Sequence, residues 1–287
     1  MSVEKSAPKN GVFYVIATPI GNLADISARA KDVMASVSCL YAEDTRHTGA
    51  LCRRLGLHAR LVSLHEHNER DRIAEVIARL QSGESVGLVS DAGTPLISDP
   101  GYRIVAACHE RNLPVSPIPG ASSLLAALSV CGLPTDEFTF CGFLPHKRSA
   151  RCKVLAELEN RQTTTVFFES RHRIVESLAD VENILGGGRR ICVARELTKT
   201  FETILSGGVS VVLEQIQANS DWQKGEFVLV VGGGEELVTS FSPEVRSLLL
   251  DVAAEVAPRR ASSIVSSHTG VDKKILYEFL VAQKNSI

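Results

Sequence analysis

A chain of 287 residues, with 44% hydrophobic and 22% charged residues, has the size and composition of a globular protein of two domains and a small appendage. Its 31 basic and 33 acidic residues leave a net charge of −2, which argues against a non-specific nucleic-acid binder. Seven cysteines without a C-x-x-C pair argue against a disulfide framework and a zinc ribbon. The polar start and the short apolar runs predict a cytoplasmic protein with no signal peptide and no membrane span.

In the first part of the chain, short apolar runs alternate with helical patterns. One helix is predicted by the i, i+3, i+4, i+7 spacing of Ile73, Val76, Ile77 and Leu80. The expected strands cover 13–17, 39–43, 60–64, 85–90 and 114–118, and the expected helices cover 27–36, 70–81 and 102–110. This order predicts a mostly parallel sheet with helices on both faces, whose ligand lies beyond the carboxyl ends of the strands.

The second part predicts another α/β domain, for which a mixed sheet is one option. It opens with 139–145, and its strand candidates are 163–170, 189–196 and 225–233. Helices are expected at about 148–160, 171–184 and 209–218. We therefore expect a two-domain α/β protein, with boundaries at 1–121 and 122–236, followed by a tail over 237–287.

The sequence pattern of the tail predicts helices only. Pro258 opens its second helix, Gly270 ends that helix, and Asp272 can cap a third. The residues expected to face inward are Val245, Leu248, Leu249, Val252, Ala261, Ile264, Val265, Ile275, Leu276, Phe279 and Leu280. Three short helices with a glycine turn resemble a helix-turn-helix appendage.

Four loops that follow strands carry the residues suited to ligand binding: 17–27, 90–101, 119–123 and 194–202. Glycines such as Gly93 permit close backbone approach, and prolines such as Pro19 stiffen the loops. Ser122 and Ser123 stand where a helix should begin, so their hydroxyls and amides could hold a carboxylate or a ribose. The alternative is that these glycines and prolines only make turns. No G-x-G-x-x-G or P-loop pattern is present, which disfavours a dinucleotide or nucleoside triphosphate site.

Four motifs follow one another in the first half: ATPIGNLADIS (17–27), AEDTRHTGALC (42–52), VSDAGTPLISDPG (89–101) and PIPGASSLLAAL (117–128). With ARELTKTFE, GEFVLVVGG and the helical tail, the chain resembles the ribosomal RNA small-subunit methyltransferase I family, of the tetrapyrrole-methylase-like class, over nearly its whole length. The resemblance implies S-adenosylmethionine (SAM) in the cleft between two α/β domains. It also implies methylation of a cytidine ribose 2′-hydroxyl at the decoding site, with the small ribosomal subunit or its rRNA as partner, and a homodimer.

The resemblance also carries over the cofactor residues. The G-G-D-P loop of the wider superfamily corresponds to 92–95, where Thr94 replaces the acidic residue. The residues expected to bind SAM are Pro19, Asp91, Ala92, Gly93, Thr94, Ile97, Ser122, Ser123 and Phe168. No metal is expected, because the sulfonium of SAM already activates the methyl group.

A carboxylate is a candidate acceptor for the proton of the weakly acidic ribose hydroxyl. Asp44 and Glu196 rank first, because their loops should face each other across the cleft, and Arg46 beside Asp44 could steer the substrate. The other candidates are Glu43, Asp91 and Asp99. Two alternatives stay open: Glu43 and Asp44 are only an acidic pair at a helix N-terminus, or orientation alone suffices for the reaction.

The candidate RNA contacts form two basic groups. The first comprises Lys147, Arg148 and Arg151, and the second comprises Arg259, Arg260, Lys273 and Lys274. A solvated helix face is the alternative for the first group, and a stabilising appendage or dimer contact is the alternative for the tail. Two rival functions remain: a small-molecule methyltransferase that acts on a tetrapyrrole, and a non-catalytic RNA-binding or assembly factor.

Overall fold

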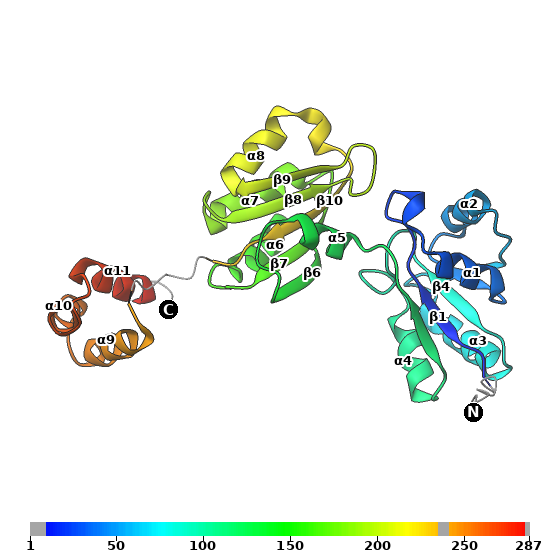
Figure 1. Ribbon diagram of the computed structural model, residues 1–287, viewed down its shortest axis with the longest axis horizontal. Helices are drawn as coiled ribbons and strands as arrows, with labels where there is room; N and C mark the ends of the chain where they lie inside the picture. Colours follow the sequence, from blue (N-terminus) through cyan, green and yellow to red (C-terminus); the bar gives the residue numbers. More distant parts are fainter. Residues whose placement is uncertain (1–9, 235–240, 285–287) are drawn as a thin grey trace, which may run out of the picture. The chain divides into compact units, whose positions relative to one another are not determined.

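The computed structural model describes residues 10–234 and 241–284. The chain forms two compact units, one of residues 1–159 and 163–232 and the other of residues 160–162 and 233–287, and each is described by itself (Figure 1). The domain boundary expected after residue 121 stays a prediction. The boundary expected after residue 236 lies outside the described residues.

The first unit begins with a sheet of five strands in the order β3-β2-β4-β1-β5. The strands are β1 (Phe13–Ile16), β2 (Leu40–Ala42), β3 (Leu61–Ser63), β4 (Val86–Val89) and β5 (Val115–Ile118). Every pair is parallel, as the alternation of strands and helices predicts. The carboxyl ends of β4, β1 and β5 therefore lie side by side, and so do the loops that leave them.

Helices cover both faces of this first sheet. They are α1 (Ala28–Ser36), α2 (Thr45–Leu55), α3 (Glu69–Gln81) and α4 (Tyr102–Glu110). Met34 of α1 and Cys52 of α2 pack on one face, and Val76 of α3 and Ile104 of α4 pack on the other. The prediction of helices on both faces is confirmed. Helix α2 was not among the predicted helices and appeared only as the alternative for Asp44.

The second sheet has the order β6-β7-β10-β8-β9. Its strands are β6 (Phe138–Phe143), β7 (Thr164–Ser170), β8 (Arg190–Arg195), β9 (Thr203–Gly208) and β10 (Glu226–Val231). The sheet is mixed, because β6 and β7 are parallel and all other pairs are antiparallel. Strand β9 has no counterpart in the predicted elements, because its sequence TILSGG is short and ends in two glycines.

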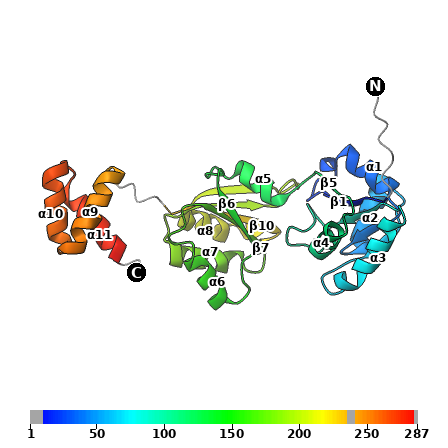
Figure 2. The same cartoon turned by 90° about the horizontal axis from the view of Figure 1, so that it is seen from below.

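The helices of the second sheet divide unequally between its faces. They are α5 (Ser123–Val130), α6 (Arg148–Ala156), α7 (Ile174–Leu185) and α8 (Val209–Ala218), with short 3-10 turns at Leu23–Asp25 (η1) and Ser220–Gln223 (η2). Helices α6, α7 and α8 pack on one face, and α5 packs on the other (Figure 2). Helix α5 therefore leads the chain from the last strand of the first sheet onto the second sheet.

The second unit has a small core of its own. Its helices are α9 (Pro243–Glu255), α10 (Pro258–Thr269) and α11 (Lys273–Lys284). The buried residues of this core are Phe241, Leu249, Ala261, Val265, Leu276, Phe279 and Leu280. Gly270 ends α10 in the left-handed conformation, and Asp272 Oδ1 accepts a hydrogen bond from Lys274 N at 2.7 Å, as predicted. Among the described residues, no helix is long and apolar enough to cross a membrane.

Candidate functional site

The loop that follows β4 is tied by its backbone to the loop that follows β1. Thr18 N donates to Gly93 O at 2.8 Å, and Gly93 N donates to Thr18 O at 3.1 Å. Gly93 has a φ of 82°, and a Cβ there would meet Ile20 Cγ2 at 3.2 Å. The positive φ and the close approach to Ile20 thus favour a glycine at this position. The amide of Gly93 is already engaged, so this residue shapes the loop and does not offer its amide to a ligand.

A third loop joins these two at the start of α5. Thr94 Oγ1 donates to Ala121 O at 3.1 Å, which ties the loop after β4 to the loop after β5. Ser122 is the N-cap residue of α5, and its side chain makes no capping hydrogen bond. The hydroxyls of Ser122 and Ser123 and the first amides of α5 therefore stay available on the side where the loops meet.

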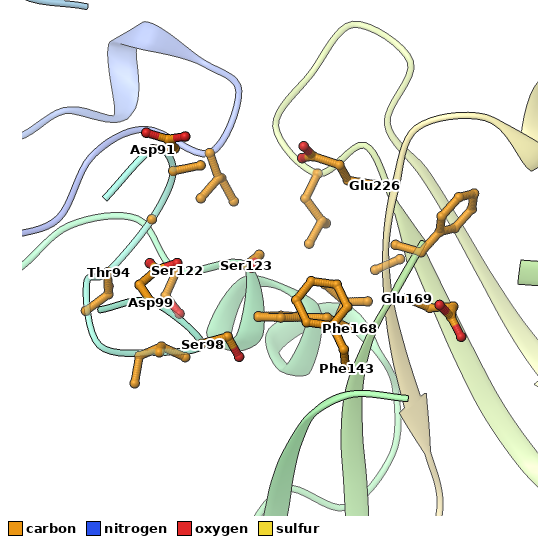
Figure 3. Close-up of a pocket in the computed structure, with 18 residues that line it drawn as sticks. Asp91, Thr94, Ser98, Asp99, Ser122, Ser123, Phe143, Phe168, Glu169 and Glu226 are labelled. Carbon is orange, nitrogen blue, oxygen red and sulfur yellow. The ribbon is translucent and has the colours of Figure 1, made fainter. Parts of the chain in front are cut away.

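These loops form one wall of a pocket, called the first pocket, with a volume of about 300 Å³ (Figure 3). It is lined by every residue expected to bind the cofactor except Pro19, namely Asp91, Ala92, Gly93, Thr94, Ile97, Ser122, Ser123 and Phe168. The other wall comes from the second sheet and from Leu197. The residues of the second sheet in this wall were not predicted from the sequence, because they belong to stretches whose pattern indicates only strands of a core: Phe143, Glu169, Ala194, Glu226, Phe227 and Val228.

Carboxylates gather at the carboxyl end of the first sheet. Asp91 and Asp99 line the first pocket, and Asp91 Oδ1 accepts a hydrogen bond from Asp44 N at 3.1 Å. Burial, and then the charges of Glu43 and Asp91, raise the pKa of Asp99 to about 6. Burial and the charge of Asp91 also raise the pKa of Glu43. Asp99 therefore combines a place in the first pocket with a proton affinity near neutrality.

Asp44 stands at the N-terminus of α2 and lines neither this pocket nor the second one described below. Its Oδ1 accepts from Arg46 N at 2.8 Å, and its Oδ2 pairs with Arg46 Nη2 at 2.7 Å. Hydrogen bonds from Arg46 hold the pKa of Asp44 well below its usual range. The side chain of Arg46 is 90% exposed. This arrangement is that of the alternative considered for Asp44, a helix cap beside a solvated arginine.

Glu196 lies in a second pocket, with a volume of about 530 Å³, which shares Phe143, Glu169 and Glu226 with the first. Glu196 Oε1 accepts from Lys199 Nζ at 2.8 Å and from Glu226 N at 2.9 Å. Burial opposes the ionisation of Glu196, but these two hydrogen bonds outweigh it and lower its pKa. Asp44 and Glu196, expected to face each other, do not line the same pocket.

The first basic group divides in two. Lys147 and Arg148 are exposed at the start of α6, although Arg148 Nε also pairs with Asp180 Oδ1 at 2.8 Å. Arg151, by contrast, is 1% exposed, and its Nη2 lies 2.7 Å from Asp180 Oδ2. The expected contact between Arg151 and RNA is therefore corrected: the α6 pattern turns this side chain inward against α7, where it forms a buried ion pair.

The second basic group lies on the helices of the second unit. Arg259 and Arg260 are exposed in the first turn of α10, and Lys273 and Lys274 are exposed in the first turn of α11. Lys274 Nζ lies 3.9 Å from Glu278 Oε1. Exposure leaves these four side chains open to contact with RNA.

Relatives of known name cover nearly the whole chain. A model of the Tetrapyrrole (Corrin/Porphyrin) Methylases matches residues 12–211. The chain is 42% identical over 274 residues to the ribosomal RNA small subunit methyltransferase I of Escherichia coli O157:H7, and the alignment covers 96% of each chain. It is 45% identical over 273 residues to the protein of that name from Pseudomonas aeruginosa, over 93% of this chain and 96% of the relative.

Solved structures with the same fold are more distant in sequence. Cobalt precorrin-4 methyltransferase superposes with a TM-score of 0.57 at 14% identity, over 80% of this chain and 98% of that one. Uroporphyrin-III-C-methyltransferase from Thermus thermophilus superposes with a TM-score of 0.54 at 18% identity, over 77% of this chain and 94% of that one. At these identities the likeness concerns the fold, which is the expected two-sheet α/β architecture.

Proposed function

The chain belongs to the ribosomal RNA small subunit methyltransferase I family, within the tetrapyrrole methylases, and from this premise we propose that it transfers a methyl group from SAM to small-subunit rRNA. The acceptor we propose is the ribose 2′-oxygen of a cytidine at the decoding site. The observation that carries the proposal is the first pocket, where three strand-following loops of the first sheet meet residues of β6, β7, β8 and β10 of the second sheet.

The lining of the first pocket fits the chemistry of SAM. Ile20, Ile97 and Val228 offer an apolar surface for an adenine ring. Asp91 can accept hydrogen bonds from an ammonium group or a ribose diol, and Ser122 with the first amides of α5 can donate to a carboxylate. Bound SAM would supply a methyl group that its sulfonium has already activated.

The protein's part in the reaction is to orient the ribose hydroxyl and to take its proton. A proton acceptor works best when its pKa lies near the working pH. Asp99 meets that condition and lines the first pocket, whereas Asp44 and Glu196 have lowered pKa values and lie outside it. We therefore place Asp99 first among the candidate acceptors, with Glu196 of the adjoining second pocket next.

The remaining parts of the proposal concern partners and location. Lys147, Arg148 and the four basic residues of α10 and α11 are the proposed contacts to RNA phosphates. The partner is the small ribosomal subunit or its rRNA, and the protein acts in the cytoplasm as a homodimer that needs no metal.

Binding of the cofactor can be tested at α5 by calorimetric titration with SAM. Replacing Ser122 and Ser123 together by alanine removes two donors at the pocket, and we expect SAM affinity to fall roughly tenfold or more. Ser129→Ala, at the other end of α5, serves as the matched control. If the double variant is folded and binds SAM as tightly as the control, the cofactor does not lie at this helix.

The acceptor class can be tested with labelled SAM. The proposal predicts label in the rRNA of small subunits and none in a tetrapyrrole precursor. A protein that binds SAM but labels only the tetrapyrrole would be a small-molecule methyltransferase, and a protein that binds no SAM would be a non-catalytic factor.

A further inference from the structure

The second pocket adjoins the first along a shared wall. Phe143, Glu169 and Glu226 line both, so a molecule seated in the second pocket would touch the residues that bound the first. Methyl transfer requires the acceptor oxygen to lie in line with the methyl group, within a few ångströms of it. A space that opens beside the cofactor site is therefore the place where an acceptor can approach.

Phe143 gives this wall an exposed aromatic ring. The residue ends β6, and 57% of it is exposed to solvent. Its ring meets Phe168 edge to face, with a centroid distance of 5.5 Å and an interplanar angle of 67°. Exposed aromatic rings are the surfaces on which proteins stack unpaired bases of single-stranded RNA.

Arg171 gives the same pocket a cation that no acid neutralises. It lies in the turn after β7, where its Nε donates to His172 Nε2 at 3.3 Å. Among the described residues, no carboxylate lies within ion-pair distance of its guanidinium. The other lining cation, Lys199, differs, because its Nζ lies 2.8 Å from Glu196 Oε1 and 2.9 Å from Glu226 Oε2. Arg171 thus keeps its charge and its planar donors for a phosphate.

Building on the proposed function, we propose that the second pocket is the acceptor subsite, which receives one ribonucleotide turned out of the RNA. The base stacks on Phe143, and a phosphate of the same nucleotide or its neighbour binds Arg171. Lys199 is a positioning residue, because its two carboxylate partners fix the loop 196–202 that closes one side of this pocket. The ligand is the proposed cytidine within a single-stranded segment of the RNA, and its ribose lies at the wall that the two pockets share.

The decisive variant is Arg171→Gln, because Arg171 lines the second pocket and not the first. In an assay with small ribosomal subunits and SAM, we expect the KM for subunits to be about tenfold higher for this variant than for the wild-type protein. The slope of log affinity against log salt concentration should fall by about 0.7, the value for one phosphate contact to a single strand. The Kd for SAM should stay unchanged, and Arg171→Lys should recover most of the loss.

Phe143→Ala tests the stacking surface, and Phe143→Trp, which restores an aromatic ring, should rescue it. The matched controls are Arg190→Gln, at the start of β8, and Phe138→Ala, at the start of β6, because neither residue lines either of these two pockets. The wild-type protein could methylate subunits while Arg171→Gln behaves like the Arg190→Gln control. That result would overturn the acceptor subsite and leave the proposed function intact. A higher Kd for SAM in Arg171→Gln would also overturn the acceptor subsite, since the second pocket would then belong to the cofactor. Failure of the wild-type protein itself to methylate subunits would instead contradict the proposed function.

Discussion

Asp99 is the residue at which location and proton affinity coincide. It lines the first pocket, and burial with two neighbouring carboxylates raises its pKa to about 6. If Asp99 takes the proton of the ribose hydroxyl, the single-turnover rate should rise with pH through about 6, as the carboxyl group becomes ionised. Asp99→Asn should slow this rate by about a hundredfold and flatten the pH profile. A variant with the wild-type rate and pH profile would exclude Asp99 as the proton acceptor.

The same raised pKa has a consequence for stability. Asp99 binds its proton more tightly in the folded protein than in the unfolded chain, where the pKa of an aspartate is about 3.9. The stabilisation by this group is therefore complete below pH 4 and is lost as pH rises through about 6. Asp99→Asn mimics the protonated form, so its Tm should exceed the wild-type Tm at pH 7.5, and the two should converge near pH 4. The exposed Asp136→Asn control should show no such pH-dependent gain in Tm. If Asp99→Asn shows none either, the pKa of Asp99 is not raised.

Asp44 should matter to the helix and not to the chemistry. It caps α2 and pairs with Arg46 outside both pockets. We expect Asp44→Ala to lower the Tm, Asp44→Asn to keep it because asparagine is an equally good cap, and both to methylate at the wild-type single-turnover rate. A large loss of rate in Asp44→Asn, with SAM binding intact, would restore Asp44 as the proton acceptor.

Single residues also show where reasoning from the sequence stops. The loop residues 91–94 and the Ser122–Ser123 pair line one pocket, because parallel strands send their loops to one edge of a sheet, and their binding of SAM stays a prediction. Arg151 was misplaced, because a run of basic residues does not reveal which one faces inward. The inward direction of Arg151 depends on the packing of α7 against α6, which brings Asp180 to its guanidinium.

At the scale of elements, the buried pair of Arg151 and Asp180 joins α6 to α7. Removing one partner leaves the other charge buried, although Arg148 still reaches Asp180. Arg151→Ala should therefore lower the free energy of unfolding by about 3 kcal/mol in denaturant titrations. Combining Arg151→Met with Asp180→Leu should recover most of that loss, and Arg148→Ala should have little effect because its side chain is 72% exposed. An Arg151→Ala variant as stable as the wild type would contradict the inward placement.

Elements with a clear period were predictable, and elements decided by their partners were not. Helix α4 (Tyr102–Glu110) and helix α8 (Val209–Ala218) have the predicted limits, because their apolar spacing and flanking residues agree. Strand β9 lacks such a signal and exists through its antiparallel pairing with β8. The residues of the second sheet that line the first pocket could not be predicted either, because a strand pattern does not show which buried residues border a pocket.

In the whole molecule, we expect the second unit to contribute to RNA binding and not to cofactor binding. The residues of both pockets belong to the first unit, and the helices of the second unit have a core of their own. A chain that ends before Ser242 should therefore bind SAM with wild-type affinity in calorimetry but lose activity on small subunits. Loss of SAM binding in a truncated chain that stays folded would assign the tail to the cofactor site.

Mass mapping of the rRNA shows whether this chain methylates small-subunit rRNA with SAM. Small subunits from a strain that lacks this gene would be incubated with the purified protein and SAM, digested with nuclease, and compared with untreated subunits. The account predicts one additional methyl group, on the ribose of a cytidine at the decoding site. An unmodified rRNA after incubation with a protein that binds SAM would contradict the claim, and a methyl group on a base would contradict the proposed acceptor.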